Sequence, residues 1–307
     1  MSSSVPGMAF AMTFAAASFF ASAASGDMPT ADPDAPKPHA TVSLISESDT
    51  FTPGSTITLG LSFAIEKDWH LYWNGRNDTG LAPSAEFTLP EGFTMGEWQW
   101  PAPIRHVLPG DILDHVYEGR VTLIIPVHIA ADVKPRSAAT ISAKVDWLVC
   151  NEACVPESGE VKLTLPIGPS TPPGKRSPDD KFLAEARNRV PTPLPADGKA
   201  ATIKWTKDKV QIAAPGAAGL AFFPATDCIE LAHPIADTAT DGASLTINVK
   251  LDDNPALRGV LEVRRPGKPT VYYTIDAKPM RAAPPDVHPP KSEAPAKEPQ
   301  APTSDRR

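Results

Sequence analysis

Hydrophobic and polar residues alternate with the period of a β-strand over much of this chain, beginning near residue 40. The segment 56–65 shows the pattern most clearly, because apolar residues there alternate with small or polar ones. Similar runs predict further strands over 41–45, 69–73, 84–89, 94–100, 120–129, 139–149 and 161–166. Roughly seven or eight short strands separated by turn residues predict an antiparallel β-sandwich of immunoglobulin type.

A second β-rich region follows a break in the pattern. Ser177 and Pro178 predict the start of a short helix with Ser177 as its N-cap, and Phe182, Leu183 and Ala186 give it an apolar stripe. Strands are then predicted over 201–205, 209–213, 219–223, 228–231, 244–251, 260–264 and 270–275. The predicted fold class is therefore all-β: an immunoglobulin-like antiparallel β-sandwich, a short connector helix and a second β-sandwich-like domain.

Composition supports folded domains joined and flanked by proline-rich segments. The 307 residues are 41% hydrophobic, and 36 of them are proline. We expect a signal peptide over 1–24, a linker over 25–39, the first β domain over 40–168, a linker and connector helix over 169–190, the second β domain over 191–278 and a disordered Pro-rich tail over 279–307. The 29 basic residues are outnumbered by 36 acidic ones, so we expect no nucleic-acid partner.

The N-terminal segment resembles an export signal. Its apolar run, 8–21, is rich in alanine and phenylalanine, and Ala21-Ser22-Ala23 resembles a cleavage site. The first seven residues carry no Lys or Arg, so a retained membrane anchor stays an alternative. Export would place the protein in the periplasm, an oxidising compartment in which a disulfide persists.

The reactive chemistry of the sequence is concentrated in one cysteine pair. Cys150 and Cys154 are separated by three residues at the end of a predicted strand. Such a pair can cycle by thiol–disulfide exchange, form a static disulfide or bind a soft metal. A static link would close so short a ring that it would contribute only about 2 kcal/mol, and no second Cys or His pair lies nearby to complete a zinc site. We therefore favour the redox pair and expect no cofactor and no metal. Cys228, the third cysteine, is predicted to be a buried free thiol.

The segment 106–118 contains Pro109-Gly110 and is predicted to be a loop. Asp111, Asp114 and His115 could accept a proton there, although ordinary solvated loop residues are the alternative. Tyr72 and Tyr117 could flank and shield the sulfurs, or they could be core aromatics.

Several separated motifs give the chain a family resemblance. They are His70-Leu71-Tyr72-Trp73, Asp78-Thr79-Gly80-Leu81-Ala82-Pro83, Trp98-Gln99-Trp100-Pro101, Tyr117-Glu118-Gly119, Trp147-Leu148-Val149-Cys150 and Cys154-Val155-Pro156-Glu157. In these residues the chain resembles the N-terminal periplasmic domain of the DsbD family of thiol–disulfide interchange proteins, especially its two-domain ScsB-like branch. The resemblance is close over about 40–168 and looser to about 278.

The resemblance implies a domain that takes electrons from a membrane-embedded thiol reductase. It would pass them to thioredoxin-like periplasmic proteins, which repair disulfides or serve cytochrome c maturation. The family's reactive cysteines correspond to Cys150 and Cys154, with Cys154 forming the mixed disulfide and Cys150 resolving it. The family's protective cap loop corresponds to about 108–117.

This sequence has no multi-helix membrane domain, no thioredoxin domain and no C-x-x-C motif, so we expect the electron donor to be a separate protein. If the pair is active, the protein is a thiol–disulfide oxidoreductase. The alternatives are a non-catalytic binding or assembly module with a structural disulfide, and a copper- or zinc-handling protein.

Overall fold

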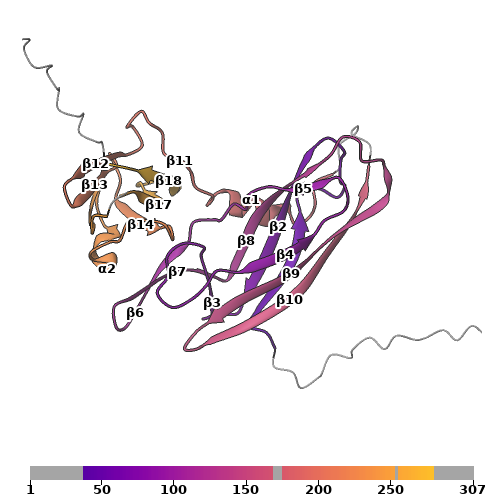
Figure 1. Cartoon of the computed structure of the whole chain (residues 1–307), viewed down its shortest axis with the longest axis horizontal. Helices are drawn as coiled ribbons and strands as arrows, with labels where there is room; N and C mark the ends of the chain where they lie inside the picture. The colour runs from indigo at the N-terminus through magenta and orange to yellow at the C-terminus, as the bar shows by residue number, and fades with distance from the viewer. Residues whose placement is uncertain (1–36, 169–174, 253–254, 280–307) are drawn as a thin grey trace, which may run out of the picture. The chain divides into compact units, whose positions relative to one another are not determined.

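The structure, a computed structural model of the chain, describes residues 37–168, 175–252 and 255–279, and strands dominate these residues (Figure 1). The predicted all-β fold class is therefore confirmed. The predicted signal peptide, the predicted tail from residue 280 onward and the predicted linker as far as residue 36 lie outside the described residues. Within the described part of the chain, neither helix has the length and apolar character needed to cross a membrane.

Ten strands form two antiparallel sheets in the first half of the chain, which we call the N-terminal sandwich. One sheet has the order β1-β2-β8-β5, and the other has the order β10-β9-β3-β7-β6 with β4 paired to β9. The strands are β1 (Ala40–Ser46), β2 (Thr56–Ile65), β3 (His70–Tyr72), β4 (Ser84–Thr88), β5 (Phe93–Met95), β6 (Ile104–Leu108), β7 (Ile112–Glu118), β8 (Arg120–Ile129), β9 (Arg136–Cys150) and β10 (Cys154–Ile167).

The two sheets are held together by the alternation of their side chains. In β9, Ile141, Val145 and Trp147 are buried, whereas the intervening Lys144 and Asp146 are exposed. The Trp147 ring meets Phe63 of the opposite sheet edge to face, with centroids 5.5 Å apart. The odd-numbered residues of β9 thus form the inner, core-facing side of their sheet.

The segment 106–118, predicted as a loop, is instead part of the hairpin β6–β7. Its turn contains Gly110 and Asp111, which both have positive φ angles, of 91° and 61°. Glycine and aspartate tolerate this left-handed conformation, so the turn allows the flanking residues to pair as strands. The expected cap loop over 108–117 is therefore a short turn followed by most of β7.

Helix α1 (Asp180–Arg187) packs on the outer side of the first sheet. Ile45, Gly60 and Ile124 form one row across β1, β2 and β8, and Leu183 is completely buried against this row. A Cβ atom on Gly60 would lie 2.9 Å from a Leu183 methyl group, so the missing side chain makes room for the helix.

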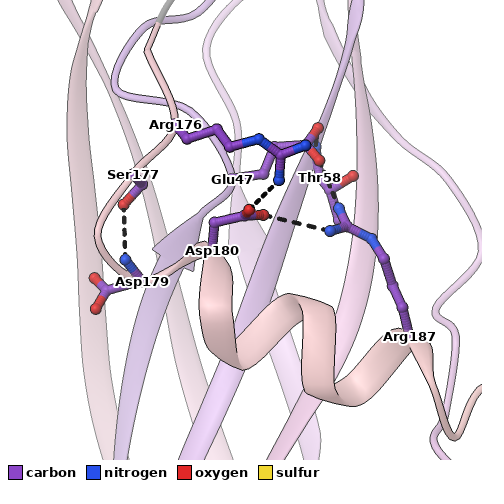
Figure 2. A network of polar contacts seen from close by, with 7 residues as sticks. All are labelled: Glu47, Thr58, Arg176, Ser177, Asp179, Asp180 and Arg187. Atoms are coloured by element: carbon purple, nitrogen blue, oxygen red, sulfur yellow. Dashed lines mark hydrogen bonds and ion pairs between the residues drawn. The ribbon is translucent and has the colours of Figure 1, made fainter.

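Polar contacts fix both ends of α1 (Figure 2). Arg187 pairs with Asp180 at 3.3 Å and with Glu47 at 2.5 Å, and Arg176 also pairs with Asp180. Ser177, the predicted N-cap, accepts a hydrogen bond from the Asp179 amide at 3.3 Å, but the helix itself begins at Asp180. The prediction was wrong by two residues because the turn over 177–179 precedes the helix.

The C-terminal β region contains a five-stranded sheet, β11-β18-β17-β14-β15, and a three-stranded sheet, β12-β13-β16. Its elements are β11 (Thr192–Pro193), β12 (Thr202–Thr206), β13 (Lys209–Ala213), β14 (Gly219–Pro224), α2 (Pro234–Asp237), β15 (Ala239–Thr240), β16 (Ser244–Asn248), β17 (Leu257–Arg264) and β18 (Val271–Ala277). The strand predicted over 228–231 is wrong: a turn precedes Cys228, and Leu231 alone forms a bridge, to Val249. Phe223 and Val260 of this region join the hydrophobic cluster of the N-terminal sandwich. The predicted domain boundaries stay a prediction.

Candidate functional site

Cys150 and Cys154 form a disulfide at the tip of the β9–β10 hairpin. Cys150 ends β9, Cys154 begins β10, and the two residues face each other in the antiparallel register with their sulfurs 2.02 Å apart. The two sulfurs differ in accessibility, because Cys150 is buried at 2% exposure whereas Cys154 is exposed. An incoming thiolate can therefore reach Cys154, and Cys150 is placed as the leaving group.

Cys150 departs from the alternation of β9. As an even-numbered residue it lies on the outer side of the sheet, where the neighbouring even positions are exposed or half-buried, yet it is buried. It forms a small cluster with Tyr72, Val116 and Leu148, separate from the sandwich core. Local covering by other side chains, and not the sandwich core, shields this sulfur.

Tyr72 connects the disulfide to a chain of hydrogen bonds. Its hydroxyl oxygen lies 3.5 Å from Cys154 Sγ and 3.0 Å from Thr79 Oγ1. Thr79 donates its only hydroxyl proton to Asp114 Oδ2 at 2.5 Å, so Tyr72 must donate to Thr79. Burial raises the pKa of Tyr72, which keeps its proton at neutral pH. The Tyr72 proton therefore points away from Cys154, toward Thr79 Oγ1.

Asp114 anchors the loop that follows β3. Its carboxylate is fully buried and accepts hydrogen bonds from the Asp78 amide at 2.8 Å and from the Thr79 amide at 3.1 Å, in addition to the Thr79 hydroxyl. Asp78 Oδ2 accepts in return from the Leu113 amide at 2.7 Å. These bonds fasten the loop to the β6–β7 hairpin. Asp114 is buried in strand β7, so the alternative prediction, an ordinary solvated loop residue, is wrong.

The same loop lies over the Tyr72 ring. A Cβ atom on Gly80 would lie 2.1 Å from that ring, so only glycine permits this approach of the backbone. Leu81 follows with 73% of its surface exposed, and together with Trp147, Leu148 and Pro156 it lines a cleft of about 310 Å³ beside the disulfide hairpin.

The remaining predicted site residues lie elsewhere. Asp111 is at the turn of β6–β7 and is exposed. Tyr117 is on the inner side of its sheet, where its hydroxyl donates to the Pro101 carbonyl at 2.5 Å and burial raises its pKa well above the usual value. Tyr117 is therefore a core aromatic on the opposite side of the sheet from Cys150.

His115 also lies on the inner side, away from the disulfide. Its Nδ1 donates to the Arg76 carbonyl at 2.6 Å, so the unprotonated nitrogen is Nε2, which is buried without a hydrogen-bond partner among the described residues. Burial lowers the pKa of His115 to about 4. Trp73 and Phe223 meet its ring edge to face.

Two residues at the site were not predicted as functional: Thr79 and His70. Both belong to the motifs that carried the family resemblance, but neither stood out chemically. The strand period places His70 on the same side of β3 as Tyr72, which was the available signal for His70. Thr79 had no local signal, because its partner Asp114 is 35 residues away.

Cys228 is a free, buried thiol, as predicted. Burial raises its pKa above the usual value, and its backbone carbonyl accepts a hydrogen bond from Arg76 at 2.6 Å.

Among the described residues, no group of three or more His, Cys, Asp or Glu side chains is arranged to hold a metal ion.

Comparison with known proteins bears on the first half of the chain. Residues 41–166 match the family model described as thiol:disulfide interchange protein DsbD, N-terminal, which confirms the predicted family resemblance over that segment. No curated protein matches the chain.

Solved structures give weaker similarities. The N-terminal periplasmic domain of ScsB from Proteus mirabilis is 15% identical, with 77% of this chain and 91% of that chain covered and a TM-score of 0.49. The E. coli chaperone DraB is 12% identical, with 77% and 98% covered and a TM-score of 0.23.

Proposed function

We propose that the protein is a periplasmic thiol–disulfide interchange module that relays electrons through Cys150 and Cys154. The observation that carries this proposal is the unequal accessibility of the two sulfurs in one disulfide. An exposed sulfur that can be attacked and a buried sulfur that can leave are what directional exchange needs. The family match over residues 41–166 supports the same chemistry.

In the proposed cycle, a membrane-embedded thiol reductase supplies the electrons. Its thiolate attacks Cys154 Sγ, the Cys150–Cys154 bond breaks, and Cys150 leaves. A second reductase thiol then releases the dithiol form of the protein. Cys154 next attacks the disulfide of a thioredoxin-like periplasmic protein, and Cys150 resolves the mixed disulfide, which restores the starting bond and leaves the client reduced. Such clients include proteins of disulfide repair and of cytochrome c maturation.

The surroundings of the pair fit a partner that must dock before exchange. Tyr72 lies against Cys154, and the exposed Leu81 borders the cleft beside the hairpin. An apolar side chain of the client placed in this cleft would hold the client's disulfide within reach of the Cys154 thiol. We propose Tyr72 and Asp114 as supporting residues, whereas Asp111, His115 and Tyr117 have no proposed role in exchange.

The test is the reduction potential of the pair, measured by equilibration in thiol buffers followed by alkylation and mass spectrometry. A structural disulfide lies below about −300 mV, so the relay requires a higher value. In a Cys228→Ser background, Cys150→Ser should accumulate a mixed disulfide with a thioredoxin-like protein, and the matched Cys154→Ser variant should not. A pair that stays oxidised under strong reductant, with no trapped species, would make the protein a binding module with a structural disulfide.

A further inference from the structure

One row of side chains crosses the sheet at the disulfide. Cys154 of β10 is opposite Cys150 of β9, Cys150 is opposite His70 of β3, and His70 is opposite Glu118 of β7. Residues directly opposite one another in antiparallel strands lie on the same side of the sheet with Cβ atoms about 5 Å apart. His70 is thus the cross-strand neighbour of Cys150, on the side away from Cys154.

The imidazole of His70 has a free nitrogen in a buried place. His70 is only 4% exposed, and its Nε2 atom has no hydrogen-bond partner among the described residues. Buried polar atoms are normally paired, so an unpaired ring nitrogen beside a redox sulfur needs an explanation. Burial, followed by the neighbouring His106, lowers the pKa of His70 to about 4, while Asp114 acts in the opposite direction. The ring is therefore neutral at pH 7 in the disulfide form, and negative charge that develops on Cys150 in the reduced form raises the pKa of His70 and helps it to accept a proton.

A route to solvent begins on the other side of His70. The His106 ring of β6 lies 4.8 Å from the His70 ring, centroid to centroid, and Tyr72 meets His70 edge to face at 5.3 Å. His106 and Glu118 line a cleft of about 650 Å³ together with Trp69. The groups that face His70 are thus Cys150, Tyr72, His106, Asp114 and Glu118, and two of these border open solvent.

We propose that His70 is the proton acceptor for Cys150 when Cys150 resolves a mixed disulfide on Cys154. This inference rests on the exchange function proposed above. In this step the Cys150 thiol gives its proton to His70, its sulfur attacks Cys154 Sγ, and the bond between Cys154 and the client sulfur breaks. The client leaves as a thiolate with the electron pair of that bond, and the proton on His70 passes to solvent through the cleft at His106 and Glu118.

The step can be isolated with dithiodipyridine, a small disulfide that releases a coloured thiopyridone. Reduced protein in a Cys228→Ser background should release two equivalents under excess reagent. The first, from attack by Cys154, depends on reagent concentration, and the second, from resolution by Cys150, does not. We expect the wild-type second phase to be nearly independent of pH between about pH 5 and about pH 8, because neutral His70 takes the proton throughout.

His70→Gln keeps a polar side chain of similar size but cannot accept a proton near neutral pH. At pH 6 its second phase should be at least about tenfold slower than that of the wild-type protein. Below pH 6 the rate should fall about tenfold for each pH unit, because it follows the fraction of Cys150 that is thiolate. Its first phase should keep the wild-type rate, which a merely structural role of His70 would not preserve. His128→Gln, which changes an exposed histidine on β8 in the other sheet, should leave both phases unchanged.

The two proposals fail in different ways. If the wild-type protein releases only one equivalent of thiopyridone, Cys150 does not resolve the mixed disulfide on Cys154, and the exchange function itself is overturned. If His70→Gln releases two equivalents with the wild-type pH profile, only the role of His70 is overturned. If His70→Gln does not fold, NMR of wild-type protein with ¹⁵N-labelled histidine decides the question. The reduced protein should show an unprotonated Nε2 on His70 at neutral pH, and a proton on that nitrogen would overturn the inference.

Discussion

Asp114 is the hydrogen-bond acceptor that holds the loop after β3, and its replacement tests whether these hydrogen bonds keep that loop in place. Asp114→Ala leaves the amides of Asp78 and Thr79 and the Thr79 hydroxyl without their acceptor in a fully buried place. A buried donor left unsatisfied costs about 1–3 kcal/mol. Since water can enter the polar space left by the carboxylate, we expect the free energy of unfolding to fall by about 3–6 kcal/mol in total.

Asp114→Asn separates the loss of charge from the loss of the acceptor. The amide oxygen can take the place of Oδ1 and keep both backbone donors, so we expect a loss of only about 1–2 kcal/mol. The amide nitrogen would then donate to Thr79, which would turn its own proton toward Tyr72 and free the Tyr72 proton for Cys154. The variant should therefore lower the pKa of the Cys154 thiol in the reduced protein.

The assay is urea unfolding of the oxidised protein, followed by tryptophan fluorescence, with alkylation rates of Cys154 across pH for the reduced form. Asp111→Asn, the same chemical change at the exposed turn of the same hairpin, is the control and should stay within about 0.5 kcal/mol of wild type. Equal losses for Asp114→Ala and Asp114→Asn, or a loss below about 1 kcal/mol for Asp114→Ala, would show that the three hydrogen bonds do not hold the loop.

Three further predictions concern the shield, the helix and the pH dependence. Tyr72→Phe removes the hydroxyl that lies against Cys154, so dithiothreitol should reduce the disulfide several-fold faster, with a stability change of about 1 kcal/mol; an unchanged rate would refute shielding. Leu183→Ala should cost about 2–5 kcal/mol in urea unfolding because Leu183 is completely buried, whereas the exposed Glu185→Ala should cost little; equal losses would contradict the docking of α1. Because the pKa of His115 is about 4 in the folded protein and about 6.5 in the unfolded chain, the unfolded chain binds more protons between these values. The stability that His115 provides is thus complete above about pH 6.5 and declines by about 3 kcal/mol as the pH falls to about 4; His115→Gln should lack this component, and identical pH profiles of unfolding would refute it.

The sequence by itself determined the elements whose pattern is local. The strand period predicted β2 and β8 with the bounds that the structure has, because a half-buried strand shows its two sides in the order of its residues. It also placed Cys150 and Cys154 at a strand end, since the alternation runs through residue 149, but it began the following strand at residue 161, whereas β10 begins at Cys154. The hairpin β6–β7 was missed because Asp114 and His115 are polar yet buried, which breaks the alternation on which the prediction depends.

Only the tertiary structure decided what surrounds the disulfide. Asp114 is buried because donors from the loop after β3 satisfy its carboxylate, and that pairing spans 35 residues. His70 adjoins Cys150 because one residue pair joins β3 to β9, and a shift of that register by one residue would turn the imidazole into the core. Side-chain period tells which residues share a side of a strand, but the neighbours of that strand are chosen by packing and by distant hydrogen bonds. The chemistry of the cysteine pair is therefore local in sequence, whereas the groups that shield it and receive its proton are set by the fold.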